Sequence, residues 1–194
     1  MGTEFRLLAV SGSLRAKSSN AALLQASQRL SPPLTVVSLY GGLADLPHFN
    51  PDHDGDVLPP AAAEWRRIVG CADGLLISSP EYARGIPGSL KNALDWLVGD
   101  PDFAGKPVAL FNASQRAVDA QRALLLTLQT MSAHIIESAS ITVPLIGRAG
   151  DIDDILADQA LTTEIRRALE ALLHAVQNRR VGDANPETSS TAFP

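Results

Sequence analysis

The chain has 194 residues, of which 45% are hydrophobic and 19% are charged. These proportions are ordinary for a globular domain and argue against an intrinsically disordered chain. The formal net charge of −5 argues against a nucleic-acid-binding protein. No apolar run approaches the length of a membrane span, and the first residues lack the basic region of a secretory signal. We therefore expect a protein with neither a nucleic-acid partner nor a membrane partner.

The single cysteine, Cys71, cannot form an internal disulfide. It lies near the predicted end of a helix, where we expect a buried, unreactive thiol and not a catalytic nucleophile. This cysteine usage fits a reducing, cytoplasmic setting.

The first predicted strand, residues 5–10, leads directly into a polar loop over residues 11–20 and then into a helix over residues 21–30. This arrangement favours anion binding, because a helix N-terminus offers unpaired N–H groups and partial positive charge. Arg15 adds a forked cationic donor, and Gly12 lets the backbone approach a ligand closely. The loop hydroxyls belong to Ser11, Ser13, Ser18 and Ser19.

The spacing in this loop matches neither the P-loop nor the dinucleotide-binding pattern. A mononucleotide with a terminal phosphate remains, which points to FMN. The simpler alternative is a plain turn in which Ser19 or Asn20 caps the helix. We favour anion binding, because four serines, a glycine and two cations lie within ten residues.

Residues 34–39 predict a second strand, and residues 40–58 form a long irregular stretch before a helix over residues 61–71. Within the stretch, residues 48–54 contain two histidines and two other potential ligands, Asp52 and Asp54. We expect a solvated loop and no metal site, because the segment offers no rigid scaffold or supporting hydrogen bonds for metal ligands.

A third strand over residues 74–79 leads to a second informative loop, residues 80–88, and then to a helix over residues 89–98. In open parallel sheets, ligands bind beyond the carboxyl ends of the strands. Two prolines and two glycines stiffen this loop and let its backbone lie close to a flat ligand.

The rest of the chain continues the alternation of strands and helices. The predicted elements are a strand over 107–111, a helix over about 117–131, a strand at 134–136 continued at 140–143, and one or two helices between Ile155 and Val176. We therefore predict one α/β domain over residues 1–180, a doubly wound, flavodoxin-like parallel sheet of five strands in the order 2-1-3-4-5 between two helical layers, and a polar tail over residues 181–194. That order makes the loops after strands 1, 3 and 4 converge on one crevice.

Two motifs resemble the NAD(P)H-dependent FMN reductase family, which includes flavodoxin-like chromate and quinone reductases. The first is Gly12-Ser13-Leu14-Arg15-x-x-Ser18-x-Asn20. The second follows the family's P-E-Y-N-x-x-x-P-G-x-L-K-N-A-x-D-W segment, although Ala83 replaces the usual asparagine. Its matching residues are Pro80, Glu81, Tyr82, Pro87, Gly88, Leu90, Lys91, Asn92, Ala93, Asp95 and Trp96.

The resemblance implies an FMN enzyme that takes hydride from NADPH or NADH and reduces a quinone, free flavin or another small electron acceptor. The flavin carries the chemistry, so no side chain is expected to act as a catalytic acid or base. The family also implies a homodimer or homotetramer, and backbone contacts from residues 81–85 to the flavin ring. The predicted cofactor-binding residues are Ser11, Ser13, Arg15, Ser18, Ser19, Asn20, Pro80, Glu81, Tyr82, Ala83, Arg84, Gly85 and Ser114.

Several roles stay open at this point. Tyr82 either packs or flanks the flavin, whereas Trp96 is expected to pack. Arg84 either meets the phosphates of a nicotinamide nucleotide or lies in solvent. Lys91 and Asp95, four residues apart, predict an ion pair on a helix surface.

The third loop departs from the family pattern. Ser114 is kept, but residues 115–119 contain no glycine, although the family usually places glycines there. A β-branched valine, Val118, does not readily take a positive φ, so this turn must differ in shape. Arg116 either attracts a phosphate of the nicotinamide nucleotide or narrows the entrance.

Two other functions stay open beside the enzyme. One is a non-enzymatic FMN electron carrier of flavodoxin type, and the other is a phosphate-binding regulator without flavin. Carriers often bury the ring against aromatic walls, and Tyr82 is the only aromatic residue of residues 80–88. That composition favours an open site that admits substrates.

Overall fold

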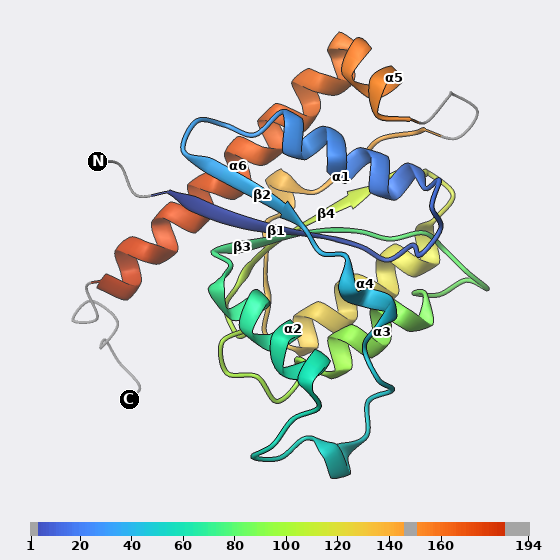
Figure 1. Ribbon diagram of the computed structural model, residues 1–194. Coiled ribbons are helices and arrows are strands. Elements are labelled where there is room, and N and C mark those ends of the chain that lie inside the picture. The colour runs from blue at the N-terminus through green and yellow to red at the C-terminus, as the bar shows by residue number, and fades with distance from the viewer. Residues whose placement is uncertain (1–3, 146–150, 185–194) are drawn as a thin grey trace, which may run out of the picture.

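The computed structural model describes residues 4–145 and 151–184. A parallel sheet lies between two helical layers, with α1, α5 and α6 on one side and α2, α3 and α4 on the other (Figure 1). The strands are β1 (Phe5–Ser11), β2 (Thr35–Leu39), β3 (Gly74–Ser78), β4 (Pro107–Asn112), β5 (His134–Ile135) and β6 (Ile141–Thr142). The helices are α1 (Ser19–Arg29), α2 (Pro60–Cys71), α3 (Gly88–Asp95), α4 (Val118–Thr130), α5 (Ile152–Ala157) and α6 (Gln159–Ala184).

The strand order is β2-β1-β3-β4-β5, and every pairing is parallel, which confirms the predicted topology. The predicted fifth strand and its continuation are two short strands, which both pair with β4. A 3-10 turn, Glu137–Ala139, separates them. There the hydroxyl of Ser140 accepts the backbone N–H of Leu110 at 3.1 Å, so β4 keeps a hydrogen-bond partner across the break.

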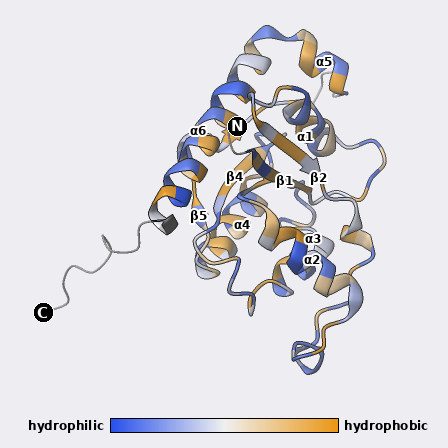
Figure 2. Ribbon diagram, turned by 60° about the vertical axis from the view of Figure 1, so that its left-hand side comes forward, coloured by the Kyte–Doolittle hydropathy of each residue, from blue (hydrophilic) through white to orange (hydrophobic). Residues whose placement is uncertain are grey.

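The sheet has one apolar core on each face, because successive strand side chains point to opposite sides. Leu7 and Ala9 of β1 belong to the core beneath α1 and α6. Leu8 and Val10 belong to the core on the other face, which also holds the buried Trp65. In Figure 2 the central strands are mainly hydrophobic, whereas hydrophilic and hydrophobic residues alternate along α6. This pattern is expected of a helix that covers a sheet with one face only.

The end of α6 lies beyond the predicted domain boundary, because the helix continues to Ala184. Near this end of the helix, the guanidinium of Arg180 pairs with Asp73 at 2.5 Å and lies 4.5 Å from the ring centre of Phe5. These contacts fasten the last turns of α6 to the sheet. The rest of the predicted tail, residues 185–194, lies outside the described residues.

The expectation of a buried thiol is wrong, because Cys71 is exposed. It is the last residue of α2, and the buried Val69 lies two positions earlier. Two helical steps turn the chain by about 200°, so Cys71 faces away from the side that Val69 buries. None of the described helices is both long and apolar enough to cross a membrane.

Candidate functional site

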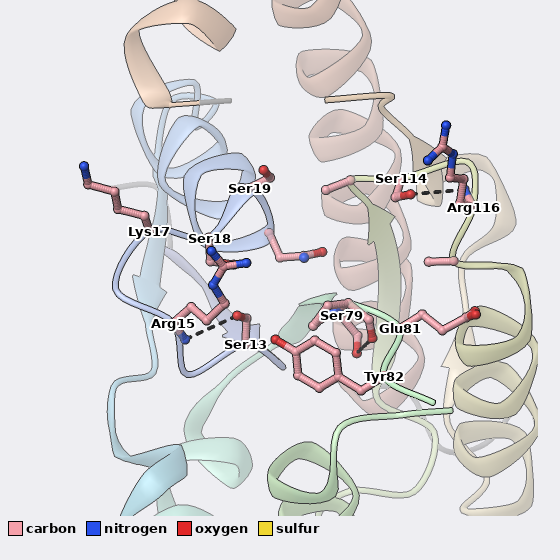
Figure 3. Close-up of a pocket in the computed structure, with 14 residues that line it drawn as sticks. Ser13, Arg15, Lys17, Ser18, Ser19, Ser79, Glu81, Tyr82, Ser114 and Arg116 are labelled. Carbon is pink, nitrogen blue, oxygen red and sulfur yellow. Dashed lines mark hydrogen bonds between the residues drawn. The ribbon is translucent and has the colours of Figure 1, made fainter. Parts of the chain in front are cut away.

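The loops after β1, β3 and β4 meet around a cavity of about 440 Å³ (Figure 3). This size lies within the usual range for small-molecule sites. The cavity is lined by Ser13, Arg15, Lys17, Ser18, Ser19, Asn20, Ser79, Pro80, Glu81, Tyr82, Ala113, Ser114, Arg116 and Ala117. The three loops singled out in the sequence therefore converge on one crevice, and most of the predicted residues line it.

The first turn of α1 forms one end of the cavity. Ser18 is the N-cap, and its hydroxyl accepts the backbone N–H of Ala21 at 3.4 Å, so the cap is neither of the two predicted residues. The buried Asn20 accepts a hydrogen bond from the hydroxyl of Ser78 at 2.8 Å, which ties α1 to the end of β3. No acceptor among the described residues takes the backbone N–H of Ser19 or Asn20. These donors are therefore available to an anionic ligand.

Hydrogen bonds within the first loop set its shape. The hydroxyl of Ser11 bonds to the backbone N–H and carbonyl of Ser13, both at 3.3 Å, so Ser11 supports the loop and does not line the cavity. The hydroxyl of Ser13 in turn accepts the backbone N–H of Arg15 at 3.3 Å. A Cβ on Gly12 would lie 2.8 Å from the Oγ of Ser79. The glycine is required for close packing of the first two loops.

The charged groups of the cavity lie on two walls. Arg15 and Lys17 occupy the wall next to α1, and Arg116 lies across the cavity from them (Figure 3). No ion pair between described residues involves any of these three cations. The one lining carboxylate, Glu81, accepts two backbone N–H groups at the N-terminus of α4, which offsets its charge. The cavity is thus a positive region on a protein of negative net charge.

The loop after β3 contains a tight β-turn with two residues between its hydrogen-bonded ends. Tyr82 and Gly85 exchange backbone hydrogen bonds of 3.1 Å and 3.0 Å. Ala83 and Arg84 between them have φ values of 48° and 62°, which identifies a type I′ turn. Tyr82 precedes the turn and lines the cavity, with 48% of its surface exposed. Ala83, Arg84 and Gly85, which were predicted to contact the cofactor, are not among the lining residues.

Arg84 lies in solvent, one of its two predicted roles, because its side chain is 85% exposed. Its Nε lies 2.6 Å from the Oδ2 of Asp119 in an ion pair at the surface. This pair joins the turn after β3 to the first turn of α4. Sequence reasoning missed it because the partners lie 35 positions apart.

Several residues of the second motif fix structure and do not line the cavity. Trp96 is fully buried, as expected, and its Nε1 donates to the carbonyl of Pro47 at 2.8 Å. Asn92 donates to the same carbonyl and accepts the backbone N–H of Phe49 at 2.7 Å. Lys91 and Asp95 form the predicted ion pair. The motif therefore anchors the long stretch after β2.

The histidine- and aspartate-containing segment, residues 48–54, has structural contacts of its own. Asp54 pairs with Arg66 of α2 at 2.6 Å. Across residues 4–145 and 151–184, no group of three or more His, Cys, Asp or Glu side chains is arranged to hold a metal ion.

The loop after β4 closes the cavity with residues 113–117. The side-chain oxygen of Asn112 accepts the backbone N–H of Ser114 at 3.0 Å. The hydroxyl of Ser114 accepts the backbone N–H of Arg116 at 3.1 Å. None of residues 115–119, all of them described, has a positive φ. The chain builds this turn from short side-chain hydrogen bonds and without glycine, and α4 begins at Val118, one residue later than predicted.

The family model for NADPH-dependent FMN reductases matches residues 5–146. The chain belongs to this family. An NAD(P)H-dependent FMN reductase of Pseudomonas aeruginosa is 33% identical over 177 residues, which cover 89% of this chain and 95% of that protein. A quinone reductase of Escherichia coli is 33% identical over 125 residues, or 63% of this chain and 66% of that one.

Solved structures agree with the fold of this FMN reductase family member. A flavoenzyme NAD(P)H:(acceptor) oxidoreductase from Paracoccus denitrificans superposes with a TM-score of 0.74 and 24% identity, covering 90% of this chain and 98% of that one. An oxidoreductase from Corynebacterium diphtheriae superposes with a TM-score of 0.65 and 18% identity, covering 91% of this chain and 99% of that one. At these identities the likeness concerns the flavodoxin-like fold.

Proposed function

We propose that this FMN reductase family member binds FMN in the cavity and uses NADPH or NADH to reduce a small acceptor such as a quinone. The observation that carries the proposal is the α1 end of the cavity. Backbone N–H groups of Ser19 and Asn20 lie there beside the side chains of Arg15 and Lys17, and none of these four groups has a hydrogen-bond or ion-pair partner among the described side chains and backbone. Such a helix N-terminus is suited to a phosphate group. When bound, FMN supplies the redox chemistry by accepting a hydride and passing two electrons to the acceptor.

The lining residues divide into two groups by their chemistry. Ser13, Ser18 and Ser19 offer hydroxyls, and Arg15 offers a fork of N–H donors, so these side chains would hold the phosphate. The walls formed by residues 79–82 and 113–114 carry fewer charges and would enclose the flavin ring. The carboxylate of Glu81 is held by α4, so it is not placed to act as an acid or base.

Quinones are the acceptor class that the relatives favour. Besides the quinone reductase, a 2-hydroxy-1,4-benzoquinone reductase of Burkholderia is 38% identical over 116 residues, covering 58% of this chain and 62% of that one. The open cavity supports access for such molecules, because Tyr82, the one aromatic side chain among the described lining residues, is half exposed. A cytoplasmic location and a homodimer or homotetramer are part of the same proposal, and light scattering of the purified protein tests the oligomer.

The first test is a titration of the protein with FMN and with riboflavin, which lacks the phosphate. Arg15→Ala is expected to raise the FMN dissociation constant by about 10- to 100-fold, the cost of a lost hydrogen bond to a charged group. Riboflavin binding should stay unchanged. Arg67→Ala, an exposed substitution on α2, is the control with the same loss of charge. Parent-like FMN binding by Arg15→Ala would contradict the assignment.

Turnover separates the enzyme from an electron carrier. The FMN-loaded protein should oxidise NADPH or NADH continuously when a quinone is present. A protein that binds FMN but shows no steady-state turnover with either donor would be a carrier, and a protein that binds no flavin would refute both functions.

A further inference from the structure

The side chain of Glu81 connects two of the loops that form the cavity. Its Oε2 accepts the backbone N–H of Asp119 at 2.9 Å and that of Ala120 at 3.0 Å. In Figure 3, Glu81 is directed toward the helix at the right of the view and away from Arg15. Its partners lie 38 and 39 positions later in the chain, so the contact holds together segments that are distant in sequence.

This contact replaces a cap that α4 lacks. The N-cap residue of α4, Ala117, has no side chain that can accept a hydrogen bond, so the first N–H groups of the helix have no local partner. A carboxylate at this place satisfies two of them and interacts favourably with the helix dipole. The surface pair of Arg84 and Asp119 adds a second connection, but the side chain of Arg84 is 85% exposed, where ion pairs contribute little.

The loop that α4 follows is the opposite wall of the cavity. Ala113, Ser114, Arg116 and Ala117 line that wall, and the last of them directly precedes the helix. A shift of the first turn of α4 would therefore move the wall. The N-termini of α1 and α4 differ in the part of the chain that the structure describes: the N–H groups of Ser19 and Asn20 in α1 have no acceptor there, whereas two N–H groups of α4 are bound by Glu81.

We propose that Glu81 is a positioning residue, whose carboxylate fixes the wall after β4 against the loop after β3 and so sets the ring-binding part of the cavity. This inference rests on the proposed function, because it assigns one wall to the flavin ring and the α1 end to the phosphate. The two residues should then differ in what they bind: Glu81 should affect binding of the flavin ring, and Arg15 should affect binding of the phosphate group. A measurement of activity alone would not separate these two effects.

The experiment measures dissociation constants of FMN and riboflavin by flavin fluorescence, well below the melting temperature of each variant. Glu81→Ala is expected to raise both constants by the same factor, about tenfold, so that their ratio stays unchanged. Glu81→Gln keeps an oxygen that can accept both N–H groups and should change either constant less than about threefold. Glu81→Asp withdraws the carboxylate by one methylene and serves as the milder variant if Glu81→Ala does not fold. It should raise both constants in equal proportion.

Asp158→Ala is the matched control. Asp158 accepts the backbone N–H groups of Ala160 and Leu161 at 2.9 Å and 3.1 Å at the start of α6, and it does not line the cavity. This variant loses the same kind of cap and should melt at a lower temperature with both flavin constants unchanged. The proposal is overturned if a folded Glu81→Ala or Glu81→Asp protein binds both flavins like the parent, or if the FMN constant alone changes. Failure of the parent protein to bind either flavin would instead refute the proposed function.

Discussion

Ala83 and Arg84 adopt a left-handed backbone conformation that costs free energy for residues with a Cβ. Their φ values of 48° and 62° form the two centre positions of the type I′ turn after β3. Asparagine and glycine are the residues that tolerate these positions best. The family usually places asparagine where this chain has Ala83, so the departure seen in the sequence coincides with local strain.

Ala83→Asn is therefore expected to stabilise the protein by about 0.5–1 kcal/mol, a part of the cost of a left-handed alanine. Urea denaturation measures the free energy of unfolding. Ala63→Asn, at an exposed position within α2, is the matched control and should destabilise slightly, because asparagine is a poorer helix former. An unchanged or lower stability of Ala83→Asn would show that this turn is not strained.

At the scale of elements, Lys106 joins the start of β4 to the end of α2. Its side chain is buried, and its Nζ donates to the carbonyls of Val69, Gly70 and Ala72 at 2.8, 3.3 and 2.7 Å. Val69 and Gly70 belong to the last turn of α2, and Ala72 is its C-cap residue. The last carbonyls of a helix lack the partner that a further turn would supply, and the carbonyl of Val69 also accepts the backbone N–H of Ala72 at 3.1 Å. Burial lowers the pKa of Lys106 below its ordinary value.

Lys106→Met should lower the free energy of unfolding at pH 7 by about 1–3 kcal/mol, because buried carbonyls lose their donors. The pH dependence has a defined sign. The unfolded chain holds the lysine proton up to about pH 10.4, whereas the folded chain releases it at lower pH, so the contribution of Lys106 to stability rises between these values. Denaturation at pH 7, 9 and 10.5 should show a widening gap between parent and variant. A gap that narrows with pH would contradict the direction of the shift.

Apolar periodicity was sufficient to predict the strands and helices, because it depends on neighbouring residues. The order of the strands in the sheet came from their alternation with helices, which is typical of a doubly wound fold. The periodicity located the interruption at residues 137–139 but counted β5 and β6 as one strand and its continuation. It did not reveal the hydrogen bond between Leu110 and Ser140, which are 30 positions apart. The same limit applies to the site. The polar loops were visible in the sequence, but the contact of Glu81 with α4 joins residues that no local pattern connects. Positions 83–85 were assigned to the cofactor because the sequence does not reveal the turn that places them outside the lining.

At the scale of the whole molecule, charge is distributed unevenly. The protein carries a net charge of −5, yet the cavity has cations on both of its walls that form no ion pair within residues 4–145 and 151–184. A bound phosphate at the α1 end would be balanced by Arg15 and Lys17. Arg116 on the opposite wall would remain free to attract a second anionic molecule, and NADPH and NADH are both polyanions. Local fields of this kind raise the rate at which charged ligands associate, and salt weakens them.

Arg116→Gly should therefore leave FMN affinity unchanged and slow the reduction of the bound flavin by NADPH and NADH. We expect the rate of flavin reduction to fall by about five- to tenfold at subsaturating donor and low ionic strength. The fall should be smaller at high salt, where the Debye length is short. Stopped-flow absorbance follows the reaction, and Arg67→Ala on α2 removes the same charge at a distant exposed place. Faster reduction in Arg116→Gly would mean that the side chain narrows the entrance. Equal rates at every salt concentration would mean that Arg116 does not control access of the donor.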